Sequence, residues 1–114
     1  MRSRLRSARS QMESVLLSPE DAMARLNKLF IVDVQNPKYA SSVLPKSHRL
    51  NVDTLLKDIP KTQPILLTCL VGQRSFTVAQ QLIQKGYDAI YVLRGGVMAW
   101  KQAGYTVQPI KICA

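Results

Sequence analysis

Three short, continuous apolar segments constrain the fold of this chain more than any other feature. They span residues 29–34, 65–68 and 89–93, and segments with helical patterning lie between them. Strands form unbroken apolar runs when both of their faces are covered, as they are in parallel sheets. Buried strands that alternate with helices predict an α/β domain with a mostly parallel sheet.

The helical segments carry recognisable start and stop signals. Ser18 is a good cap for the first helix, Pro19 suits its first turn, and Glu20 and Asp21 complement its positive end. Further helices are predicted over residues 54–59, 75–85 and 97–103.

Composition limits the classes of function. The 114 residues are 46% apolar, which fits one globular domain, and no stretch approaches the roughly 20 apolar residues of a membrane-spanning helix. Two cysteines and one histidine exclude a disulfide framework and most zinc sites. We therefore expect a single domain that is not held together by disulfides.

The N-terminus is a basic segment with four arginines before the first acid, and it contributes much of the net charge of +9. It lacks the apolar centre of a secretory signal, so a cytoplasmic location is expected. Three interpretations stay open: a solvated arm, an organellar targeting segment, and a weak electrostatic contact with nucleic acid or anionic lipid. Nucleic acid is not favoured, because no aromatic residues are interleaved with the arginines. The expected organisation is an arm over residues 1–12, a domain over 13–108 and a tail over 109–114.

Ligands bind beyond the carboxyl ends of strands in such sheets, and here the candidate ends are residues 34–35, 68–69 and 93–94. Cys69 directly follows the second apolar run, in a loop that enters a helix after Arg74. Backbone N–H groups of such a loop converge on the sulfur, and with Arg74 they should lower the thiol pKa below its free value of about 8.5. The alternative interpretation is a buried, inert cysteine.

A second motif, Arg94-Gly95-Gly96 followed by Ala99-Trp100 and then Gly104, accompanies the loop from Cys69 to Arg74. With the apolar segment ending at Val34 and with Pro45, these motifs make residues 17–107 resemble the rhodanese family of single-domain sulfurtransferases. The resemblance implies a rhodanese-like α/β fold, with a roughly five-stranded parallel sheet flanked by helices on both faces.

The resemblance also implies a chemistry. Cys69 would take a sulfane sulfur from thiosulfate or a persulfide and pass it to an acceptor, which includes a sulfur-accepting protein. The binding loop around the persulfide would comprise Leu70, Val71, Gly72, Gln73 and Arg74. Asp33 is a supporting candidate that could pair with Arg74, and Arg94 would add positive field for an anionic donor. Similar phosphatases place five residues between cysteine and arginine; four lie between them here, which favours sulfur chemistry.

Two departures from the family pattern leave a second function open. Gln35 stands where the family usually has arginine, and Leu70 and Val71 stand where many members are polar or charged. An apolar entrance favours a less charged or protein-bound persulfide donor. The first prediction is therefore an enzyme of the thiosulfate sulfurtransferase type that needs neither a metal nor an organic cofactor. The alternative is a catalytically weak interaction or sulfur-relay module. The sequence does not indicate an oligomeric state.

Four other residues have default interpretations. His48 is expected in a turn or on the surface, and Trp100 and Tyr87 in packing. Cys113 is expected to be a spectator thiol, with a resolving thiol for Cys69 as the alternative.

Overall fold

The computed structural model describes residues 15–36, 38, 40–49, 57 and 59–110. The expected arm over residues 1–12, most of the expected helix over 54–59, and Cys113 lie outside these residues.

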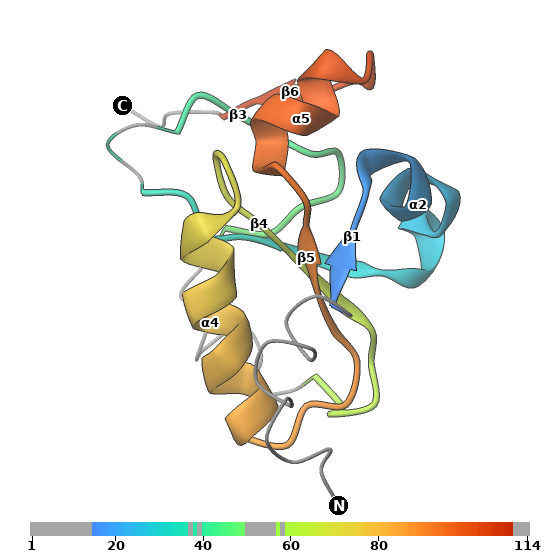
Figure 1. The fold of residues 1–114 in the computed structure, drawn as a ribbon, viewed down its shortest axis with the longest axis vertical. Helices are drawn as coiled ribbons and strands as arrows, with labels where there is room; N and C mark the ends of the chain where they lie inside the picture. Colours follow the sequence, from blue (N-terminus) through green and yellow to red (C-terminus); the bar gives the residue numbers. More distant parts are fainter. Residues whose placement is uncertain (1–14, 37, 39, 50–56, 58, 111–114) are drawn as a thin grey trace, which may run out of the picture.

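A sheet of four parallel strands forms the centre of the molecule (Figure 1). Its order across the sheet is β1 (Leu16–Leu17), β5 (Ile90–Leu93), β4 (Ile65–Thr68) and β2 (Phe30–Asp33). The three apolar segments thus form three adjacent strands, and the predicted parallel α/β sheet is confirmed. β1 has only two residues, too few for a sequence pattern to predict it.

The sheet was expected to have about five strands, and a single bridge occupies the fifth position. His48 lies beside β2 in a parallel bridge with Val32. Its N–H donates to the carbonyl of Ile31 at 2.9 Å, and its carbonyl accepts from the N–H of Asp33 at 2.8 Å. The imidazole stacks on Phe30 with ring centroids 4.5 Å apart. His48 is exposed and extends the sheet edge, which fits the expected surface position.

Helices cover both faces of the sheet. α4 (Gln73–Gln84) lies along one face, whereas α2 (Pro19–Ala24) and α5 (Gly96–Gln102) pack with the core of the other (Figure 1). Successive side chains of β4 therefore enter different cores: Ile65 and Leu67 on the α4 face, and Leu66 on the α2 and α5 face. This two-sided burial explains why the strand sequences are uninterrupted apolar runs.

The local signals for α2 and α5 are confirmed. The Ser18 hydroxyl accepts from the N–H of Asp21 at 3.0 Å, as expected of a helix cap. A short 3-10 helix, η1 (Leu26–Lys28), follows α2. In α5, Trp100 is buried, and its indole N–H donates to the carbonyl of Thr106 at 2.8 Å.

A small second sheet joins β3 (Ser42–Val43) to β6 (Gln108–Pro109) in antiparallel orientation. These strands have only two residues each and no alternating pattern, so the sequence did not predict them. β6 includes residues on both sides of the expected domain boundary at residue 108.

None of the helices in the described residues is long and apolar enough to cross a membrane.

Candidate active site

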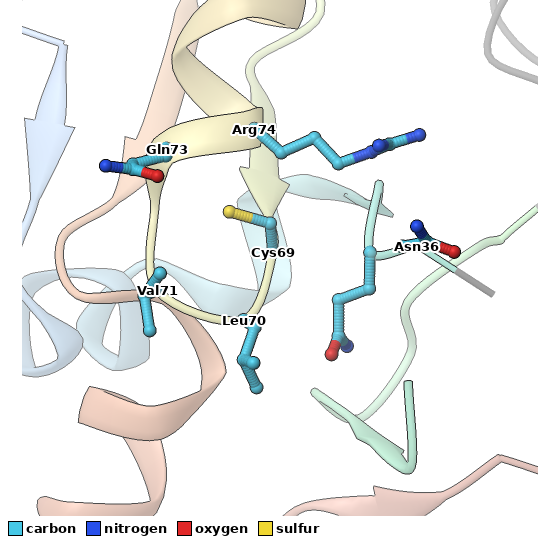
Figure 2. A pocket seen from close by; sticks show the side chains of 7 residues that line it. Asn36, Cys69, Leu70, Val71, Gln73 and Arg74 are labelled. Atoms are coloured by element: carbon cyan, nitrogen blue, oxygen red, sulfur yellow. The ribbon is translucent and has the colours of Figure 1, made fainter. Parts of the chain in front are cut away.

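Cys69 lies at the end of β4, in a short loop that leads into α4 (Figure 2). The side chain is 3% exposed, and the N–H of Gly72 donates to its Sγ at 2.9 Å. Gly72 has a φ of 104°, in the left-handed region that favours glycine, and it caps α4. The helix therefore begins at Gln73, two residues before its predicted start, which places Gln73 and Arg74 in the first turn.

The start of α5 contacts this loop through two backbone hydrogen bonds. The N–H of Val97 donates to the Cys69 carbonyl at 2.8 Å, and the N–H of Met98 donates to the Leu70 carbonyl at 3.1 Å. Gly96 makes this approach possible: its φ is 66°, and a Cβ there would collide with both carbonyl oxygens. The loop from Cys69 to Arg74 and the motif that begins at Arg94 therefore contact each other directly in the fold.

Cys69 lines a pocket of about 190 Å³. The pocket has two walls from different segments of the chain, which we call the loop wall and the strand-end wall. The loop wall consists of Leu70, Val71, Gln73 and Arg74, and the strand-end wall consists of Gln35 and Asn36. Leu70 and Val71 are 44% and 56% exposed, so this mouth of the pocket is apolar.

The strand-end wall was only partly anticipated. The sequence analysis named residues 34–35 as a candidate strand end but did not assign Gln35 or Asn36 to the site. Their position directly after an apolar strand was the available signal, because parallel strands end at one edge of the sheet.

Asp33 lies beneath the strand-end wall as the acceptor of a buried hydrogen-bond network. Its carboxylate accepts from the Thr68 hydroxyl at 3.1 Å and from the Gln35 N–H and side-chain Nε2 at 3.0 and 2.8 Å. The Nε of Arg49 pairs with the same carboxylate at 3.2 Å. Because Thr68 directly precedes Cys69, the network connects the strand-end wall to the base of the loop.

The suggested pairing of Asp33 with Arg74 was wrong: Arg49 is the cationic partner of Asp33. Arg74 is exposed and makes no ion pair with any described residue. In Figure 2 the Cys69 sulfur and the Arg74 guanidinium extend in opposite directions. The reason is the early start of α4, which carries Arg74 on its outer side while the irregular segment before residue 50 brings Arg49 to Asp33.

Gln35 takes one part of the role of the arginine that the family pattern would place there. Its Nε2 donates to Asp33 at 2.8 Å and to the Ser42 carbonyl at 2.9 Å. Arg49 supplies the positive charge, and its Nη2 also approaches the Gln35 carbonyl at 3.5 Å. Asp33 therefore has a cationic partner, Arg49, which comes from another segment of the chain.

The remaining candidate, Arg94, is not part of the pocket lining. It is exposed at the end of β5, and its N–H donates to the Leu17 carbonyl at 2.8 Å.

Chemically, the site offers a thiol and one N–H donor to its sulfur, that of Gly72. Among the described residues that line the pocket, none is an Asp, Glu or His that could act as a general acid or base. Within the described part of the chain, no three His, Cys, Asp or Glu side chains are grouped as metal ligands would be. One buried hydroxyl, that of Ser75 in the first turn of α4, has no hydrogen-bond partner among the described residues.

Comparison with known proteins agrees with this geometry. Residues 18–103 match the family model described as a rhodanese-like domain. A protein named sulfurtransferase from Allochromatium vinosum is 28% identical over 89 residues, which cover 75% of this chain and 83% of that protein.

Two solved structures share the fold. The solution structure of a rhodanese-like domain from Anabaena sp. has a TM-score of 0.74 at 19% identity, covering 84% of this chain and 80% of that one. A thiosulfate sulfurtransferase from Pseudomonas aeruginosa has a TM-score of 0.71 at 20% identity. The match covers 91% of this chain but 23% of the Pseudomonas protein.

Proposed function

This chain belongs to the rhodanese-like domain family, and from that premise we propose that it is a sulfurtransferase that carries sulfur on Cys69 as a persulfide. One observation carries the proposal: the Gly72 N–H donates at 2.9 Å to the Sγ of Cys69, a residue that lines a pocket. An N–H aimed at sulfur stabilises negative charge on it, as donors aimed at an oxyanion do. An inert core cysteine would have neither this donor nor a pocket.

The reaction has two nucleophilic displacements at sulfur. The Cys69 thiolate attacks the outer sulfur of the donor, the S–S bond of the donor breaks, and the leaving group departs with the electron pair. An acceptor thiolate or cyanide then attacks the outer sulfur of the persulfide and releases the Cys69 thiolate. Sulfite and thiolates leave as anions, so the step needs no general acid. The described residues of the pocket lining, none of which is an Asp, Glu or His, are consistent with such a step.

The second candidate is a sulfur-relay or interaction module with slow chemistry. It is favoured by the exposure of Leu70, Val71 and Met98, three large apolar side chains at and beside the loop. It is also favoured by the orientation of Arg74, which extends away from the sulfur (Figure 2). A protein that carries a persulfide or accepts sulfur would be its partner.

Intact mass after incubation with a sulfur donor tests the proposal. Thiosulfate and a small organic persulfide should be tried in parallel, with Cys69→Ser as the matched control. We expect one added sulfur on the parent chain alone, and its removal as thiocyanate when cyanide is added. A folded chain that gains no sulfur from either donor would contradict the enzyme and leave the interaction module. Sulfur on the Cys69→Ser variant would assign the chemistry to another residue.

A further inference from the structure

The strand-end wall contains the Gln35 side-chain amide, whose oxygen has no hydrogen-bond partner among the described residues. Gln35 is 6% exposed and lines the pocket, and its Nε2 has two acceptors, the Asp33 carboxylate and the Ser42 carbonyl. Both neighbours lack a proton to donate, so they fix which end of the amide carries the nitrogen. The other end, Oε1, has no hydrogen bond to any described residue. A neutral acceptor therefore stands where the family pattern has a cationic donor.

The neighbouring residue presents the opposite polarity. The Asn36 Oδ1 accepts from the N–H of Lys38 at 3.0 Å, which leaves its amide nitrogen as the available end. In Figure 2, Asn36 lies to the right of Cys69 and below the Arg74 side chain. Gln35 and Asn36 thus offer one acceptor and one donor, the complement of the N–H and C=O groups of a secondary amide.

The opposite wall of the pocket is apolar at its mouth. Leu70 and Val71 are the exposed side chains there, and they suit methylene groups better than they suit a fully hydrated dianion. A thiosulfate ion has no N–H to donate and would place its sulfonate oxygens near the Gln35 acceptor. The pocket thus combines an apolar surface with an amide-binding edge.

We propose that Gln35 determines specificity for an organic persulfide whose carbon chain carries a secondary amide. This inference rests on the proposed function and names the donor class. The Cys69 thiolate attacks the outer sulfur of R–S–SH, and the S–S bond of the donor breaks. The donor thiolate R–S⁻ leaves with the electron pair, and the outer sulfur keeps its proton as Cys69–S–SH. Atoms and charge balance without an oxidant or reductant.

The test compares two donors that differ only at the N–H. N-acetylcysteamine persulfide carries the amide, and the persulfide of 2-sulfanylethyl acetate carries an ester oxygen in its place. The rate of persulfide formation on Cys69 is measured for each by intact mass in a single turnover. Each rate is divided by the rate of transfer to a small free thiolate, which corrects for intrinsic reactivity. We expect the corrected amide rate to exceed the ester rate about threefold to tenfold, the range for one neutral hydrogen bond.

Three variants assign this preference to Gln35. Gln35→Arg, which presents only donors, should bring the amide-to-ester ratio close to one and raise the relative rate with thiosulfate. Gln73→Arg makes the same exchange on the loop wall and should retain the ratio, which separates a lost acceptor from added charge. Asn36→Ala should slow both donors by a similar factor, because both carry a carbonyl group.

The outcomes separate this inference from the proposed function. Loading of Cys69 by both donors at equal corrected rates would overturn the inference and leave the sulfurtransferase proposal intact. Loading by no donor at all would overturn the proposed function itself. A full amide preference in folded Gln35→Arg would remove Gln35 as its determinant. If that variant does not fold, the ratio in the unaltered chain still decides whether the preference exists.

Discussion

The two walls of the pocket are held in place by different kinds of interaction. The loop wall is fixed through its backbone: Gly72 caps α4, and the N–H groups of Val97 and Met98 bind the loop carbonyls. The strand-end wall is fixed through one side chain, that of Asp33, whose carboxylate accepts hydrogen bonds from four donors. Side chains of the loop can therefore change without moving the sulfur, whereas a change around Asp33 alters the polarity of the wall itself.

The largest expected effect is on the loop wall, from adding a single methyl group. Gly96→Ala would place a Cβ against the carbonyl oxygens of Cys69 and Leu70 at a left-handed φ of 66°. We expect a loss of about 3 kcal/mol in the free energy of unfolding, from strain plus displacement of the loop. Denaturant unfolding measures this loss, and the folded fraction should also show a large loss of sulfur transfer.

Gly104→Ala is the matched control for this substitution. Gly104 has a φ of 88°, but a Cβ there would meet nothing within 4 Å. Only the backbone cost of about 1–2 kcal/mol should remain, with sulfur transfer unaffected. Equal losses in the free energy of unfolding for the two variants would show that the contact between α5 and the loop does not contribute to stability.

A smaller effect is expected on the strand-end wall from Asp33→Asn. This change removes the partner of Arg49 and turns an acceptor of several hydrogen bonds into a group with its own protons. Because Arg49 is 24% exposed and keeps some solvation, we expect a loss of about 2 kcal/mol. Chemical denaturation measures it, and Arg49→Met is the paired variant. If Asp33→Asn unfolds at the parent's denaturant midpoint, the network does not stabilise the wall.

The smallest expected effect comes from Arg74→Ala. Arg74 is exposed and makes no ion pair within the described part of the chain, so the free energy of unfolding should change by less than about 0.5 kcal/mol. Its positive charge lines the pocket and should attract an anionic reagent, so alkylation of Cys69 by iodoacetate near neutral pH should slow about twofold. Arg94→Ala, outside the pocket lining, is the control with the same change in charge. An unchanged alkylation rate in Arg74→Ala would remove Arg74 from the mechanism.

The parts of the fold that have long, regular patterns could be predicted from the sequence. The run over β4 has the predicted bounds, and the cap of α2 is the predicted one. β1, β3 and β6 have two residues each, so neither periodicity nor composition could reveal them. A strand of two residues is defined by its neighbour in space, and that neighbour is distant in sequence.

The candidate site likewise has one part that local sequence predicts and one part that it does not. The position of Cys69 after a buried strand and before a helix followed from local sequence alone. The partner of Asp33 did not, because the choice between Arg49 and Arg74 depends on how an irregular segment crosses the end of the sheet. The position of the Gln35 amide nitrogen depends on the Ser42 carbonyl, which belongs to the two-residue strand β3.

The single N–H bond from Gly72 to the Cys69 sulfur has a consequence for the reaction cycle. When the proposed persulfide forms from thiosulfate, or once it loses its proton, the negative charge resides on the outer sulfur, about 2 Å farther along the S–S bond. The donor that serves the attacking sulfur is then no longer the group nearest to the charge. Each turnover therefore carries the charge away from Gly72 and back again. The thiolate form therefore needs a hydrogen-bond donor at the inner sulfur, whereas the persulfide form needs one at the outer sulfur.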